Sequence, residues 1–201
     1  RVLYGAVRRM GDAVEAHRGT VCRFMGDGLM AMFGVPTAYE SHSRQACYGA
    51  LALQSSVGAY SAELEQEFGI GLQARVGLHA GEIVALQVGE GDRAEWDASG
   101  PAVPVAARLE QYAEPGSILL TESTFELAAP HFDATKLEPI TVKGVSAPLS
   151  VMRLERAVES DGAGHPAHAT PFVGRRTERA QLLAALETCM EEGGGQTSRA
   201  D

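Results

Sequence analysis

The sequence predicts an α+β domain with a largely antiparallel sheet. Residues 1–17 and 43–68 carry apolar side chains at the helical period, which indicates two amphipathic helices. Residues 72–80 alternate apolar and polar side chains strictly, which is typical of a strand with one buried face. Because helices and several short strands are mixed along the chain, we expect one domain that contains both.

The first elements are expected to be a helix and a hairpin. The helix over residues 1–17 is followed by Gly19, a residue type that commonly terminates helices. Two short apolar runs then occupy residues 21–33, with Asp27 and Gly28 between them. An Asp-Gly pair between apolar runs favours a type I′ hairpin turn, in which both turn residues adopt positive φ.

A long helix and two strands are expected next. The helix covers residues 43–68, and Gly69 is placed to cap it. The strand over residues 72–80 has His79 on its polar side, where we assign it no ligand role. A second strand over residues 83–88 follows closely.

The second half of the domain continues to mix the two element types. A polar loop over residues 89–97 is expected to lead into a short strand around Trp96, and a helix begins near Gly100. The remaining predicted elements are strands at residues 118–120, 140–142 and 149–154 and a short helix at residues 123–128. This order again favours an α+β domain.

The composition is that of a soluble globular protein. Of the 201 residues, 45% are hydrophobic and 21% are charged, and the net charge is −9. Such a chain lacks the broad positive surface that nucleic acids or anionic membranes require, so we expect neither partner. No apolar run is long enough to span a bilayer and no signal-peptide pattern is present, which favours a cytoplasmic location with reduced cysteines.

Four motifs, taken in order, closely resemble those of the class III nucleotidyl cyclase catalytic domain. They are RFMGDGLMAMFGVP, RVGLHAGEIV, EWDASGPAVPVAARLEQYAEPGSILLT and ITVKG, and the resemblance extends over residues 1–155. It implies a ferredoxin-like α+β core that pairs head to tail with a second copy, so that composite sites form at the dimer interface. It also implies a reaction in which the ribose 3′-hydroxyl of a nucleoside triphosphate attacks the α-phosphate and expels pyrophosphate.

The resemblance implies that two divalent ions, Mg²⁺ or Mn²⁺, are held between a pair of Asp side chains. Asp27 matches the second Asp of this pair, whereas by its position alone it is a plain hairpin residue; one carboxylate can serve both roles. The first metal-binding Asp of the family belongs to a strand just before the opening helix, and this strand is not in the sequence. We therefore expect an N-terminally truncated domain that is inactive by itself.

Two residues match the purine-reading pair of the family. Arg23 stands where the family has a Lys, and Asp97 matches its Asp. Arg keeps the charge and the donors of Lys but presents them as a planar fork. Neither residue resembles the Glu that selects guanine, so ATP is favoured over GTP as substrate. The alternatives are an outward-facing strand residue for Arg23 and a loop or helix-entry acid for Asp97.

Further positions match residues that contact the ribose and the phosphates in the family. Arg108 matches the Arg that steadies the triphosphate in the transition state, and Pro104 stands where the family has a ribose-orienting Asn. Pro101 replaces the acid or amide that usually follows the Gly, so this loop departs from the family pattern twice. Lys143 matches the Lys that meets the terminal phosphates, and the alternative is a solvated edge-strand lysine.

The rest of the chain is expected to be a linker and the start of a second module. Residues 156–170 are rich in Gly, Pro and Ala and have no apolar period, which is typical of a linker. Residues 171–201 resemble the opening of an AAA-type ATPase module, although no phosphate-binding P-loop motif is present.

Together these features predict a cytoplasmic adenylate cyclase domain from a cyclase fused to an AAA-type ATPase regulator. The domain is expected to form homodimers and to make cyclic AMP from ATP. The alternative is a degenerate cyclase-like module that dimerises and regulates the downstream ATPase without catalysis. The departures at Pro101 and Pro104 keep this alternative open.

Overall fold

In this computed structural model of the protein, residues 2–89, 95–141 and 148–158 are described. They belong to one compact unit, Arg1–Glu159. Lys143, residues 159–170 of the predicted linker and residues 171–201 lie outside the described residues, so the expectations for them stay predictions.

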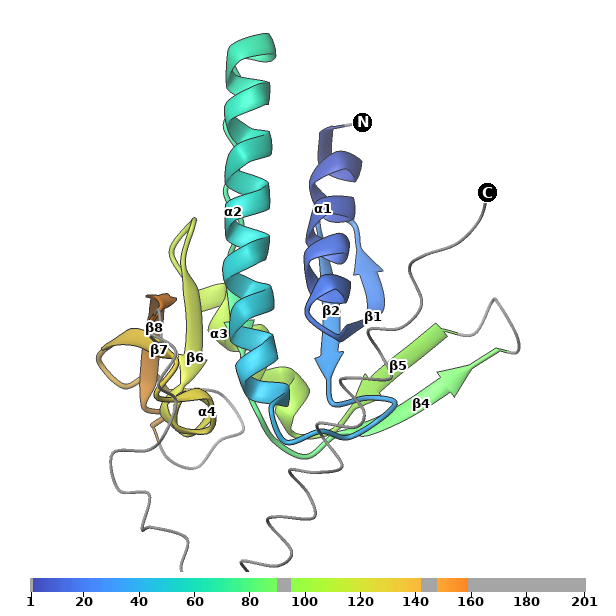
Figure 1. Cartoon of the computed structure of the whole chain (residues 1–201), viewed down its shortest axis with the longest axis vertical. Helices are drawn as coiled ribbons and strands as arrows, with labels where there is room; N and C mark the ends of the chain where they lie inside the picture. The colour runs from blue at the N-terminus through green and yellow to red at the C-terminus, as the bar shows by residue number, and fades with distance from the viewer. Residues whose placement is uncertain (1, 90–94, 142–147, 159–201) are drawn as a thin grey trace, which may run out of the picture. The chain divides into compact units, whose positions relative to one another are not determined.

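Helices form in the segments where the sequence predicts them. They are α1 (Val2–Ala16), α2 (His42–Phe68), α3 (Ala102–Tyr112) and α4 (Glu122–Ala128). α1 and α2 pack against each other (Figure 1), and the guanidinium of Arg9 lies 4.1 Å from the centre of the Tyr60 ring. The left-handed φ of 66° at Gly69 confirms the predicted cap of α2. No helix in the described ranges combines the length and the apolar character needed to cross a membrane.

The strands form three sheets. They are β1 (Gly19–Met25), β2 (Gly28–Phe33), β3 (Val76–Leu78), β4 (Val84–Val88), β5 (Glu95–Ser99), β6 (Ile118–Thr121), β7 (Phe132–Lys136) and β8 (Val151–Ala157). β1 pairs with β2, β4 pairs with β5, and the larger sheet has the order β3-β6-β8-β7. The β3–β6 pair is parallel and the other pairs are antiparallel, which confirms the predicted α+β fold.

The β1–β2 hairpin turns one residue earlier than predicted. Met25 pairs with Gly28, so the two loop residues are Gly26 and Asp27. Gly26 has a φ of 65° while Asp27 keeps a negative φ, which is the pattern of a type II′ turn. The predicted type I′ turn centred on Asp27 and Gly28 is therefore wrong, because Gly26 supplies the left-handed residue and Gly28 already belongs to β2.

The chain leaves α1 through Arg18 rather than through Gly19. Arg18 has a φ of 63°, and Gly19 is already paired with Phe33 in the hairpin. The guanidinium of Arg18 lies 4.3 Å from the centre of the Tyr39 ring, and the Tyr39 hydroxyl donates a 3.1 Å hydrogen bond to the Arg18 carbonyl. These contacts hold a left-handed conformation that a non-glycine residue otherwise adopts at a cost.

Three strands of the larger sheet differ from their predicted extent. β3 covers only three residues of the alternating segment 72–80. Instead of the strand predicted over residues 140–142, the described part of that segment makes a single bridge from Ile140 to Leu149. β7 was not predicted, because its alternation is only five residues long. β8 continues to Ala157 and so includes the first residues of the predicted linker.

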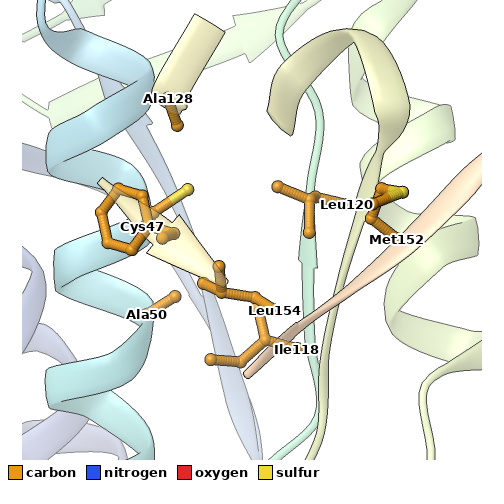
Figure 2. Packing of buried hydrophobic residues seen from close by; sticks show 8 residues of the cluster. Cys47, Ala50, Ile118, Leu120, Ala128, Met152 and Leu154 are labelled. Carbon is orange, nitrogen blue, oxygen red and sulfur yellow. The ribbon is translucent and has the colours of Figure 1, made fainter. Parts of the chain in front are cut away.

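The largest core cluster lies where α2 and α4 meet the four-stranded sheet (Figure 2). Its buried residues are Cys47, Ala50, Ile118, Leu120, Ala128, Phe132, Met152 and Leu154. The small side chains of Cys47 and Ala50 let α2 approach the sheet closely. Burial raises the pKa of Cys47 to about 12, so its thiol stays protonated.

α3 packs on β3 through a contact that requires glycine. A Cβ atom at Gly77 would overlap the carbonyl oxygen of Ala106 and the amide nitrogen of Glu110, both in the backbone of α3. On the same face of α3, Leu109 is fully buried. The missing side chain at Gly77 therefore sets how closely α3, which carries Pro104 and Arg108, approaches the sheet.

Candidate functional site

The candidate site contains an ion pair between two strands that are distant in the sequence. Nη2 of Arg23 on β1 donates a 2.8 Å hydrogen bond to Oδ1 of Asp97 on β5, across a sequence separation of 74 residues. The same oxygen accepts a 2.9 Å hydrogen bond from the backbone N–H of Ala98. The two side chains are 56% and 41% exposed, so a ligand can reach both. The structure thus brings together the two residues predicted to read the purine.

A bulge in β1 sets the direction of Arg23. The pairing with β2 shifts register between Val21 and Arg23, which leaves Cys22 without a partner opposite it. Cys22 is buried whereas Arg23 is exposed. Burial, with a smaller contribution from the charge of Asp97, raises the pKa of Cys22 to about 11. The Cys22 thiol therefore stays protonated at neutral pH.

Asp27 lies at the tip of the β1–β2 hairpin and is exposed. Its carboxylate is the hard oxygen ligand that Mg²⁺ or Mn²⁺ prefers. Within the described residues, however, no group of three or more His, Cys, Asp or Glu side chains is placed to hold a metal. These residues therefore do not fit a two-metal centre by themselves, and Asp27 offers at most one ligand to it.

Pro104 and Arg108 are exposed residues in the first two turns of α3. They are four residues apart and so share one face of the helix. Nη1 of Arg108 donates a 2.6 Å hydrogen bond to Oε1 of Gln111. Pro104 is in the first turn, where its missing N–H breaks no helical hydrogen bond. Proline at position 104 therefore suits the fold, but its side chain offers no hydrogen bond to a ribose.

Apolar side chains are exposed close to the ion pair. On β4, Val84, Leu86 and Val88 are 56%, 56% and 59% exposed, and Leu86 is opposite Asp97 in the β4–β5 pair. At the end of β1, Phe24 is 62% exposed. In Figure 1, β4 and β5 extend away from the helices. Contiguous exposed apolar groups of this kind typically mark an interaction surface or a ligand-binding groove.

Sequence reasoning left one polar residue near α3 without a role. His79 lies on the connection between β3 and β4, and its Nδ1 is 3.0 Å from Oγ1 of Thr121. No sequence signal joins these residues, which are 42 positions apart. Lys143, predicted to meet the terminal phosphates, lies outside the described residues.

The Arg23–Asp97 ion pair is expected to contribute little to folding stability, because both partners face solvent. A double-mutant cycle with Arg23→Ala and Asp97→Ala, measured by urea unfolding, should give a coupling of about 0.2–1 kcal/mol. The coupling should decrease in high salt, which screens exposed charges. A coupling above about 2 kcal/mol would contradict the exposed geometry.

Comparison with known proteins identifies relatives of the chain. The family model described as the adenylate and guanylate cyclase catalytic domain matches residues 1–155. Adenylate cyclase 1 of Rhizobium meliloti is 32% identical over 160 residues, which are 76% of this chain and 24% of that protein. An uncharacterized protein of Mycobacterium tuberculosis is 33% identical over 142 residues, 69% of this chain and 24% of that protein. The chain therefore spans about a quarter of the length of these relatives.

Solved structures show the same arrangement of helices and strands. The guanylyl cyclase Cya2 superposes with a TM-score of 0.72 at 25% identity, covering 80% of this chain and 82% of that one. The adenylyl cyclase CyaB from P. aeruginosa gives a TM-score of 0.72 at 22% identity, covering 79% and 82%. These similarities confirm the predicted fold class.

Proposed function

Because this chain belongs to the family of adenylate and guanylate cyclase catalytic domains, we propose that it forms the catalytic domain of an adenylate cyclase. The reaction converts ATP to 3′,5′-cyclic AMP and pyrophosphate. The observation that carries a purine-nucleotide substrate is the 2.8 Å bond between Arg23 and Asp97, and the choice of ATP rests on the absence at both positions of the Glu that selects guanine in the family. The name of the Rhizobium meliloti relative, an adenylate cyclase, supports the same choice.

Arg23 and Asp97 offer a donor and an acceptor side by side to the edge of a purine. Adenine presents its 6-amino group as a donor and N1 as an acceptor. The Asp97 carboxylate accepts from the first, and the guanidinium of Arg23, which has five N–H groups, donates to the second while it keeps its bond to Asp97. Both side chains are already held in place, so less conformational entropy is lost on binding.

The phosphates are assigned to cationic side chains. Arg108 is exposed on α3 and carries a charge that stabilises the negative charge developing on the α-phosphate. Lys143 is assigned to the terminal phosphates. Asp27 is assigned as one ligand of Mg²⁺ or Mn²⁺, which supplies charge neutralisation and activation of the 3′-hydroxyl when bound. The new bond joins the ribose 3′-oxygen to the α-phosphorus as the bond to the pyrophosphate oxygen breaks.

A second copy of the chain is the proposed partner at this site. The apolar side chains of Val84, Leu86 and Val88 on β4 are more than half exposed, close to the ion pair. Covering them with a second copy would remove apolar surface from water and enclose the nucleotide. Under this proposal residues 1–155 form the cyclase domain, and residues 156–170 and 171–201 are a linker and the start of an ATPase module.

A regulatory module without catalysis is the second candidate function. Pro104 is exposed at the position of the family's ribose-orienting Asn and has no side-chain donor. Pro101, the N-cap of α3, makes no side-chain capping bond. Both departures fall at the start of the helix that carries Arg108, so they favour a domain that has lost activity.

The test of the enzymatic proposal is Asp27→Ala in the natural full-length protein. Cyclic AMP formation with Mn²⁺ should fall about a hundredfold or more, because an electrostatic stabiliser of the transition state is lost. Asp12→Ala, which removes an exposed carboxylate from α1, is the matched control and should leave activity unchanged. Equal activity in both variants would contradict the role of Asp27, and a higher kcat/KM for GTP would contradict the choice of ATP.

A further inference from the structure

We propose that His79 is a positioning residue that holds the start of α3, and thereby Arg108, through hydroxyl groups at the start of α4. This inference rests on the proposed function, because Arg108 acts on a nucleotide only if the domain binds one. The contact between His79 and α4 is present in the structure whatever the substrate.

Hydrogen bonds join the connection that carries His79 to the junction of β6 and α4. Nδ1 of His79 lies 3.0 Å from Oγ1 of Thr121, and that oxygen lies 2.7 Å from Oγ1 of Thr124. Thr124 Oγ1 accepts a 2.8 Å hydrogen bond from the backbone N–H of Ala80, the residue after His79. Thr121 and Thr124 are 3% and 2% exposed, so water cannot replace a partner that is lost.

The neutral form of the His79 imidazole is the form that can accept a hydrogen bond at Nδ1. When Thr121 donates its hydroxyl proton to Nδ1, the ring carries its own proton on Nε2. Burial lowers the pKa of His79 below its ordinary value of 6.5, which favours the neutral ring at neutral pH. The conversion to a doubly protonated ring would turn Nδ1 from an acceptor into a donor.

The polar groups around the His79 imidazole are mostly hydroxyls. Besides Thr121 and Thr124, Ser123 Oγ lies 3.2 Å from Oγ1 of Thr121. Glu122, at the start of α4, accepts a 2.7 Å bond from Nζ of Lys136. Glu82, on the same connection as His79, and Arg108, on α3, are exposed to solvent.

The connection that carries His79 also contacts the start of α3. A Cβ atom at Gly81 would lie 3.1 Å from Cβ of Ala102 and 3.2 Å from Nε2 of His79, so the backbone at Gly81 fits closely between them. The carbonyl of Glu82 accepts a 3.4 Å hydrogen bond from the N–H of Ala102. The connection is therefore held on one side by α4 and on the other by the first residue of α3.

Hydrogen exchange tests this role without any need for catalysis. In His79→Leu, exchange in peptides spanning residues 79–83 and 100–104 should be about five- to tenfold faster, because the ring no longer holds the connection. Thr121→Val should have the same effect. His79→Asn, whose amide can take the place of Nδ1, should stay within about twofold of the wild type.

Peptides from α1 serve as the internal control, since α1 packs on α2 and the β1–β2 hairpin and a local effect at His79 or Thr121 leaves them unchanged. Unchanged exchange at residues 100–104 in both His79→Leu and Thr121→Val would overturn the proposal. Equal acceleration in His79→Leu and His79→Asn would also overturn it, because the hydrogen bond would then not be the cause.

The pH dependence of unfolding gives a second readout. Because the folded-state pKa of His79 is lowered, the unfolded chain binds more protons below pH 6.5. The contribution of His79 to the free energy of unfolding is therefore fully present above pH 6.5, and it is lost as the pH falls from 6.5 through the folded-state pKa. Urea unfolding at about pH 7.5 and 5 should show a larger loss in the wild type than in His79→Asn. Equal losses would contradict a half-buried His79 that is neutral in the folded state.

The activity arm separates this role from the proposed function. In the natural full-length protein, His79→Leu should lower kcat about tenfold with KM for ATP within about twofold, and His79→Asn should restore kcat. If the wild type makes no cyclic AMP but exchange is still faster in His79→Leu, the proposed function is refuted and the positioning contact stands. An active wild type with unchanged kcat in His79→Leu would refute the positioning role alone.

Discussion

Gly77→Ala should be about 3 kcal/mol less stable than the wild type, at the upper end of the costs of overpacking. The added methyl group would overlap the carbonyl oxygen of Ala106 and the amide nitrogen of Glu110. Both atoms belong to the backbone of α3, which cannot move aside as a flexible side chain can. The helix must therefore shift from β3, and the buried Leu109 loses its packing.

Urea unfolding of the chain measures this loss, with Gly58→Ala as the matched control. Gly58 lies inside α2 and a Cβ atom there meets nothing within 4 Å. Alanine at this position should stabilise the helix by about 0.5–1 kcal/mol, since glycine is the weaker helix former. If the midpoint of Gly77→Ala equalled that of the wild type, α3 would not rest on β3 as described.

Pro104→Asn should raise the rate of cyclic AMP formation about a hundredfold to a thousandfold in the natural full-length protein. The asparagine would restore an oriented polar contact to the ribose that proline lacks. Because Pro104 occupies the first turn of α3, where amide groups are largely unbonded, the exchange should change stability little. The measurement is kcat with ATP and Mn²⁺.

Ala107→Asn is the control, because it adds the same amide to another exposed position of α3, three residues further along the helix. An increase in Pro104→Asn alone supports a cyclase weakened at one position. A wild type without activity that becomes active only in Pro104→Asn supports the regulatory module. Equal rates in the wild type and Pro104→Asn would show that this position does not orient the ribose.

The helices could be predicted from the sequence because their signal extends over several turns. α2 has 27 residues and so repeats its apolar positions many times. β7 has five residues and so gives no period long enough to separate a strand from a loop, whereas the alternation over residues 72–80 predicts a strand of which only the three residues of β3 are paired. The hairpin turn was misplaced by one residue because Gly26 and Gly28 flank Asp27, and both can adopt positive φ.

The candidate site could be predicted only in part. Periodicity places Arg23 and Asp97 on their elements, but it cannot bring together residues 74 positions apart; their pairing was expected from the resemblance alone. The contact between His79 and Thr121 had no signal of either kind, because it depends on how the ends of β3 and β6 meet in space. Tertiary contacts of this type follow from packing, which local sequence patterns do not encode.

Among the described residues Cys22 and Cys47 are buried, and their alkylation rates report different motions of the domain. Cys47 is fully buried between α2 and the sheet, and a thiol reagent can reach it only when these layers separate. Cys22 is the unpaired residue of the β1 bulge, so an opening of the hairpin alone would expose it. The ratio of the two alkylation rates therefore distinguishes loosening of the β1–β2 hairpin from melting of the whole domain.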